Sequence, residues 1–128
     1  MGLAAEGSYL YMAGEMDYVC GYVEYCVSDS AETYLDFNGA SGDIFDIAYD
    51  SGDIWLACAT GHPVRRFDTS GSVVDYLEGS LIPDACGLTM DTEGFLWVAD
   101  TVNDLIYKVD LGTALERTTW GWIKHLAD

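Results

Sequence analysis

The stretch Ile54-Trp55-Leu56-Ala57 recurs 42 residues later as Leu96-Trp97-Val98-Ala99. The register then holds without a gap, so that residues 54–68 pair with residues 96–110 over fifteen consecutive positions. A fixed period of about 20 to 50 residues is typical of solenoids, propellers and other repeat architectures. The repeat therefore decides the architecture before any single element is assigned.

The first third of the chain repeats less cleanly. Leu10-Tyr11-Met12-Ala13 stands in the place of the tryptophan-containing stretch, and two extra residues follow in the next loop. Further along, Asp43–Asp50 matches Asp84–Asp91 at an offset of 41 residues. The sequence thus predicts three copies of about 42 residues. Their expected limits are residues 1–38, 39–81 and 82–128.

Each copy has the pattern of short strands. Runs of four to six residues rich in Val, Ile, Tyr, Trp and Phe are separated by turns such as Asp-Ser-Gly and Thr-Glu-Gly. The strands expected in the third copy are Gly87–Met90, Phe95–Ala99, Leu105–Asp110 and one near Leu115–Trp120. A four-stranded antiparallel meander is the unit of a β-propeller blade, so we expect an all-β chain of three blades.

The stretch from Gly87 to Thr101, which reads GLTMDTEGFLWVADT, resembles the repeat of NHL-type propellers. It also resembles the related SMP-30/gluconolactonase and strictosidine-synthase-like propellers, and the resemblance covers nearly the whole chain. It implies blades of the six-bladed class. It also implies that ligands bind on one face, where the loops from second to third strands and from each blade to the next emerge.

Three blades pose a closure problem, because propellers close with about four to eight blades. Two explanations follow. Two chains can associate head to tail about a two-fold axis into a six-bladed homodimer, which we favour. Alternatively, the chain is a piece of a longer propeller. We expect the apolar stretch Trp120–His125 to pack on the neighbouring chain or on a following blade.

The charge balance excludes one class of partner. Lys and Arg number 5 against 22 Asp and Glu, for a formal net charge of −17, so the chain lacks the clustered cations that nucleic acid demands. Its apolar runs are too short for a membrane-spanning helix, and no signal-peptide core follows Met1. We expect no membrane partner and guess an extracytoplasmic or secreted location. The acidity suits solubility, a high-salt habitat or calcium binding.

The repeat register places a set of polar residues on the loop face. As ligand-binding candidates they are Asp17, Asp43, His62, Asp84, Asp100, Asn103 and Asp104, with Glu15 beside them. Carboxylates from separate loops can hold Ca²⁺, which takes six to eight oxygen ligands, and the metal candidates are Asp43, Asp84, Asp100 and Asp104. The competing interpretation is that Asp and Asn serve there as turn residues that bond to their own backbone.

Two functions compete. The first is a non-catalytic binding or scaffolding module that takes a protein, glycan or small ligand on the loop face. The second is a calcium-dependent hydrolase or lactonase, because Leu81–Ala85 looks like the Pro-Asp-Gly segment that carries a metal-binding aspartate in the resembling lactonases. Here Ala85 replaces the glycine. No nucleophile is placed beside His62 or His125, so no catalytic residue is assigned.

Two further residue types have structural interpretations. Trp55 and Trp97 occupy equivalent positions, which predicts that both pack blade on blade. The cysteines show no C-x-x-C pair and are read as small buried residues, although Cys20 and Cys26 lie close enough to share a hairpin and form a disulfide. The four cysteines are Cys20, Cys26, Cys58 and Cys86.

Overall fold

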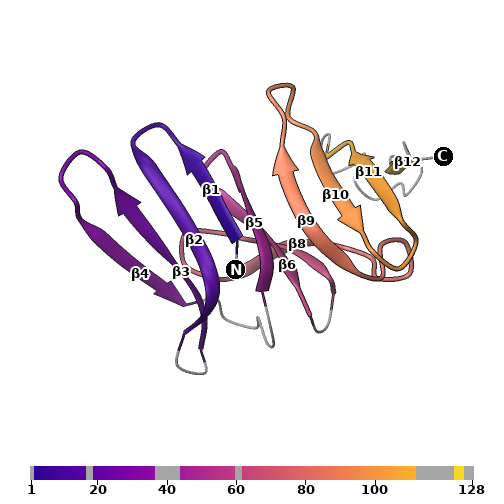
Figure 1. The fold of residues 1–128 in the computed structure, drawn as a ribbon, viewed down its shortest axis with the longest axis horizontal. Helices are drawn as coiled ribbons and strands as arrows, with labels where there is room; N and C mark the ends of the chain where they lie inside the picture. Colours follow the sequence, from indigo (N-terminus) through magenta and orange to yellow (C-terminus); the bar gives the residue numbers. More distant parts are fainter. Residues whose placement is uncertain (1, 17–18, 37–43, 60–61, 112–122, 126–128) are drawn as a thin grey trace.

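The computed structural model describes residues 2–16, 19–36, 44–59, 62–111 and 123–125. They form three four-stranded antiparallel sheets, each with its strands in chain order (Figure 1). The first is β1 (Gly2–Glu6), β2 (Tyr9–Met16), β3 (Val19–Cys26) and β4 (Glu32–Asp36). The second is β5 (Ile44–Asp50), β6 (Asp53–Cys58), β7 (Val64–Phe67) and β8 (Val73–Leu77). The third is β9 (Ala85–Met90), β10 (Leu96–Asp100), β11 (Leu105–Val109) and β12 (Ile123–His125).

This architecture confirms the predicted fold class. Each sheet is a propeller blade, and we number the blades 1, 2 and 3 in chain order. The predicted blade limits at 38/39 and 81/82 stay a prediction. Within the described residues, no helix is long and apolar enough to cross a membrane.

Short turns join the first two strands of each blade. In blade 2, β5 and β6 are joined through Ser51 and Gly52, whose φ angles are 51° and 101°. Positive φ at both central positions is the requirement of the type I′ hairpin, whose twist matches that of the flanking strands. The Asp-Ser-Gly signal in the sequence thus has a direct structural cause.

The blades fan out around their first strands. The inner strands β1, β5 and β9 lie together in the middle of the molecule, and β4 and β12 lie at its two far edges (Figure 1). Gly2 of β1 lies against the backbone of β5, because a Cβ built on it would come within 2.6 Å of the Asp46 Cα. The inner strands therefore approach closely, as they do around a propeller channel.

Two apolar clusters hold the blades together, and β6 contributes to both. Ile54, Leu56 and Cys58 pack toward blade 1, in a cluster that includes Tyr11 and Phe67. The alternate residues Trp55 and Ala57 pack toward blade 3, against residues such as Leu96 and Val98. Since successive side chains of a strand point to opposite faces, a blade between two others is buried on both.

The two tryptophans at equivalent positions differ in their surroundings. Trp55 is fully buried between blades 2 and 3, as predicted. Trp97 is only half-buried, because it lies on the face of blade 3 that points away from blade 2. The prediction of blade-on-blade packing is therefore confirmed for Trp55, and for Trp97 it stays a prediction.

The fourth strand of blade 3 lies later in the chain than predicted. The segment near Leu115–Trp120 lies outside the described residues, and β12 instead spans Ile123–His125. Its register sets Ile123 opposite Val109 and His125 opposite Tyr107. Residues 123–125 thus pair within their own blade, and the packing of Trp120–His125 on a neighbouring chain or a following blade stays a prediction. Trp120 and Trp122 lie outside the described residues.

A disulfide between Cys20 and Cys26, which the sequence left open, is not compatible with the fold. Both residues lie on β3, six positions apart, which in an extended strand separates them by roughly 20 Å. A disulfide needs Cα atoms within about 7 Å. Cys26 and Cys58 are buried, as predicted, and Cys86 is half-buried.

Candidate functional site

The loop face carries the sequence-predicted residues of blade 3 on one structural unit. Asp100 ends β10, and its buried carboxylate accepts hydrogen bonds from the backbone N–H groups of Val102 and Asn103, at 2.9 and 3.2 Å. Its second oxygen accepts a bond from the Asn103 side-chain amide at 2.9 Å. Asp100 therefore organises the β10–β11 loop, as an Asx-type turn residue does.

The same unit ties together the two kinds of loop. The backbone N–H of Thr101, in the β10–β11 loop, donates to the carbonyl oxygen of Asp84, in the β8–β9 connection, at 3.2 Å. The Thr101 hydroxyl also donates to the Asp84 carboxylate. Asp104 closes the loop with a φ of 53°. The structure thus brings Asp84, Asp100 and Asn103 together in adjoining loops.

His62 occupies a different part of the same face. It is exposed at the β6–β7 loop, and its ring stacks on Tyr76 of β8 with the ring centroids 3.9 Å apart. Its backbone carbonyl accepts a bond from Arg65 Nε at 3.1 Å. These contacts give His62 a place in the loop framework of blade 2.

The rest of the predicted site cannot be placed. Asp17 and Asp43 lie outside the described residues, and the side chain of Glu15 is not described. Among the residues that the structure describes, no group of three His, Cys, Asp or Glu side chains is arranged to hold a metal ion. The calcium site of Asp43, Asp84, Asp100 and Asp104 therefore stays a prediction.

A concavity of about 630 Å³ lies at the other end of the inner strands. The second halves of β1, β5 and β9 line it, together with the turns that follow β5 and β9. Leu3, Ile47, Leu88 and Met90 are among the lining residues, but the surface that the concavity exposes is more polar than apolar, and its rim carries hydroxyl groups. An acidic residue at or just after the end of each inner strand completes the rim. These three are Glu6, Asp50 and Asp91.

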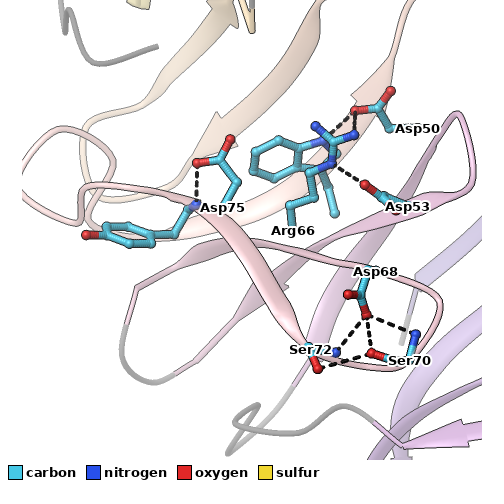
Figure 2. A network of polar contacts seen from close by, with 9 residues as sticks. Asp50, Asp53, Arg66, Asp68, Ser70, Ser72 and Asp75 are labelled. Atoms are coloured by element: carbon cyan, nitrogen blue, oxygen red, sulfur yellow. Dashed lines mark hydrogen bonds and ion pairs between the residues drawn. The ribbon is translucent and has the colours of Figure 1, made fainter. Parts of the chain in front are cut away.

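Two of these acidic residues belong to a repeated structural trio. In blade 2 the Trp55 indole N–H donates to Asp50 Oδ2 at 3.0 Å, and the Arg66 guanidinium carbon lies 5.9 Å from the indole centroid. Arg66 also pairs with Asp53, its Nε lying 2.8 Å from Oδ2 (Figure 2). A cation over an indole face is attracted by the ring quadrupole.

Blade 3 repeats the trio 41 or 42 residues later, with Asp91, Trp97 and Lys108. The Trp97 indole N–H donates to Asp91 Oδ2 at 2.8 Å, and the Lys108 ammonium lies 5.4 Å from the indole centroid and 4.0 Å from that of Phe95. The Trp97 hydrogen bond, the Phe95 backbone N–H and the nearby Lys108 charge lower the pKa of Asp91 below its ordinary value of 3.8.

Blade 1 departs from this pattern. The register sets Tyr11 of β2 opposite Glu24 of β3, where the other blades set a tryptophan opposite a cation. Tyr11 instead stacks on Tyr49 of blade 2 with centroids 5.0 Å apart. Glu6 at the rim of the concavity is exposed, whereas Asp50 and Asp91 are half-buried.

Comparisons with known proteins support the fold and do not identify a family or a function. No protein-family model matches the sequence, and a comparison with curated proteins gives no significant match. A solved structure of a luciferin-regenerating enzyme is similar, with a TM-score of 0.59 and 16% sequence identity. The similarity covers 84% of this chain and 41% of that enzyme's chain. It supports the propeller-blade fold, and the chain spans less than half the length of the enzyme that it resembles.

Sequence reasoning missed the concavity and one residue beside it. Asp46 of β5 accepts a hydrogen bond from the backbone N–H of Leu88 in β9 at 2.8 Å, which links two inner strands. The sequence did single out Asp46, because at the offset of 41 residues this acidic residue of the second copy stands against Gly87 of the third. No sequence pattern indicated the concavity, because it forms only where the inner strands of three different copies come together in space.

Proposed function

We propose that this chain is a non-catalytic binding module that holds a small organic ligand in the concavity between its inner strands. The observation that carries the proposal is the concavity itself, whose volume of about 630 Å³ lies within the range of about 300 to 1,000 Å³ of small-molecule sites.

The charge of the molecule favours a cationic ligand. The formal net charge is −17, and Glu6, Asp50 and Asp91 stand at the rim. Asp50 and Asp91 already bond to tryptophan side chains, whereas Glu6 is exposed. An amine-bearing ligand that places its apolar part against Met90 would bring its charge to this rim.

A matched series of probes tests the proposal. Tryptamine, indole-3-acetamide and indole-3-acetate share one ring system and differ in charge, and each is titrated into the ¹⁵N-labelled chain by NMR. We expect tryptamine to bind most tightly and the acetate most weakly, with shifts concentrated in the second halves of β5 and β9. Equal affinities, or shifts confined to the loop face, would overturn the proposal.

A pair of variants separates the rim from the general negative charge. Glu6→Gln removes one rim carboxylate, and we expect about a fivefold weaker affinity for tryptamine, since one charge at about 4 Å in water is worth about 1 kcal/mol. Glu32→Gln removes an exposed carboxylate from the outer strand β4 and is expected to leave the affinity unchanged. Equal effects of the two variants would show binding to overall charge only.

The second candidate is the calcium-dependent hydrolase or lactonase of the loop face. It is favoured by the hydrogen bonds that join Thr101 of the β10–β11 loop to Asp84, and by the name of the similar structure, which is that of an enzyme. Calcium would raise the melting temperature of the wild-type chain and leave that of Asp84→Ala unchanged. An equal response of both proteins to Ca²⁺ would remove Asp84 from that site.

A further inference from the structure

The outer face of blade 1 corresponds to the face that blades 2 and 3 each pack against the preceding blade. The outer face of blade 3 corresponds to the face that blade 2 packs against blade 3. One apolar cross-strand pair, between the inner strand and the second strand, occupies the same repeat position in all three blades. These cross-strand pairs are Leu3 with Met12, Ile47 with Leu56, and Leu88 with Val98. All three pairs lie on the side of their blade that faces the preceding blade.

Exposure separates the first pair from the other two. Ile47 and Leu56 are 1% and 0% exposed because blade 1 covers them, and Leu88 and Val98 are 7% and 0% exposed because blade 2 covers them. Leu3 and Met12 are 63% and 38% exposed. Blade 1 therefore presents to solvent the surface that its two successors bury.

The opposite side of the molecule shows the complementary relation. Ala57 and Val64 form a cross-strand pair of blade 2 that is fully buried against blade 3. Their equivalents 42 residues later, Ala99 and Ile106, form the same pair in blade 3, and Ile106 is 49% exposed. Blade 3 thus presents the surface with which blade 2 receives its successor.

We infer that blade 3 of one copy receives blade 1 of a second copy, and that two copies close head to tail into a six-bladed ring. The partner of blade 3 is a second copy of this chain, because blade 1 carries the surface that packs on such a face. Its aliphatic side chains have the same cross-strand register as those with which blade 3 packs on blade 2. Two sets of three blades give six, within the range of about four to eight that propellers use. The arrangement has two identical interfaces, each between unlike faces.

The ring would also complete the channel. The inner strands of the second copy would stand opposite β1, β5 and β9, so that the concavities of the two copies face one channel. The inference does not depend on the ligand proposed above, because it rests on buried and exposed equivalents of one apolar pair. Each copy carries a charge of −17, so association is expected to strengthen as salt screens the repulsion.

Light scattering on the eluting protein tests the inference. The expected mass is about 28 kDa, which is twice the chain mass of 14.0 kDa, with a larger dimer fraction at higher salt. A mass of about 14 kDa at every concentration and salt would overturn it. A series of larger masses would overturn the closed ring and indicate open head-to-tail chains.

Two variants identify the faces. Met12→Glu on blade 1 and Ile106→Glu on blade 3 each place a charge in both interfaces of the ring, so each alone is expected to give the monomer mass. Their controls are Val27→Glu and Val102→Glu, at exposed turn positions of the same blades, which are expected to remain dimeric. If only one of the two faces mattered, a symmetric face-to-face dimer would replace the proposed arrangement.

Mixing the two variants excludes misfolding as an explanation. A ring made of one Met12→Glu copy and one Ile106→Glu copy has one wild-type interface and one doubly substituted interface. We expect the mixture to recover a substantial dimer fraction that neither variant shows alone. Failure to recover, with both variants folded by circular dichroism, would overturn the head-to-tail inference.

Discussion

The carboxylate of Asp46 accepts a hydrogen bond from the backbone N–H of Leu88 over 2.8 Å, and so joins inner strand β5 to inner strand β9. Its other oxygen accepts a bond from the backbone N–H of Ile47 at 2.9 Å. An inner strand has one edge that no strand of its own sheet covers, and Leu88 itself is buried. Asp46 therefore accepts a hydrogen bond from a backbone N–H that is shielded from water at the blade junction.

We predict that Asp46→Ala destabilises the fold by about 1 to 3 kcal/mol, because the Leu88 N–H keeps its burial and loses its acceptor. Asp46→Asn retains an acceptor oxygen and is expected to cost less. Urea unfolding followed by tryptophan fluorescence measures both. Equal losses for the alanine and asparagine variants would show that the hydrogen bond does not account for the effect.

A second prediction concerns the inter-blade clusters. Leu56→Ala removes a fully buried side chain between blades 1 and 2 and is expected to cost about 2 to 5 kcal/mol. Met12→Ala, at the equivalent position of blade 1, is expected to cost within about 0.5 kcal/mol, because its side chain is exposed. Urea midpoints at the lowest usable protein concentration compare the two, and comparable losses would contradict the burial difference.

The repeat made the blade architecture predictable, and the same repeat explains where the predictions stopped. Trp55 and Trp97 are equivalent in sequence, yet only Trp55 has a blade on its indole face. No pattern within a repeat states which copy lies last in the arc. The strand Ile123–His125 was misplaced for a related reason, since the segment after Leu111 has left the 42-residue register and only pairing with β11 identifies the strand.

The candidate site was likewise predictable from the sequence only in part. The sequence assigned Asp84, Asp100 and Asn103 to one face from strand order alone, and in the structure they lie in adjoining loops of blade 3. It did not reveal that the Asp100 carboxylate accepts three hydrogen bonds from its own loop, which depends on the conformation of residues 101–104. Nor did it reveal the concavity, which requires three inner strands to be placed in space.

Thiol accessibility gives a third prediction. Cys58 is 3% exposed, whereas Cys86 is half-buried, its Sγ lying 3.5 Å from the carbonyl oxygen of Ala99. We expect Cys86 to react with Ellman's reagent in the native protein and Cys58 to react only after unfolding. Cys86→Ala should remove a native-state phase, and Cys58→Ala should remove none. Loss of the same phase in both variants would contradict the burial of Cys58.

The last prediction concerns acid stability. The pKa of Asp91 is lowered first by the Trp97 hydrogen bond and then by the Phe95 N–H, and the pKa of Asp68 is lowered first by the Ser70 hydroxyl and then by the Ser72 N–H (Figure 2). A carboxylate whose folded pKa is depressed stabilises the fold above its ordinary value of 3.8. That contribution is lost as the pH falls from about this value through the lowered folded pKa.

We therefore expect Asp91→Asn to lower the urea midpoint at neutral pH and the difference from wild type to shrink as the pH falls below 3.8. Asp68→Asn should behave in the same way, because its carboxylate serves the β7–β8 turn as Asp91 serves the β9–β10 turn. Glu93→Gln removes a neighbouring carboxylate of the β9–β10 turn and serves as the control. A difference between Asp91→Asn and wild type that stays constant from neutral to acid pH would show that the charge on Asp91 does not contribute.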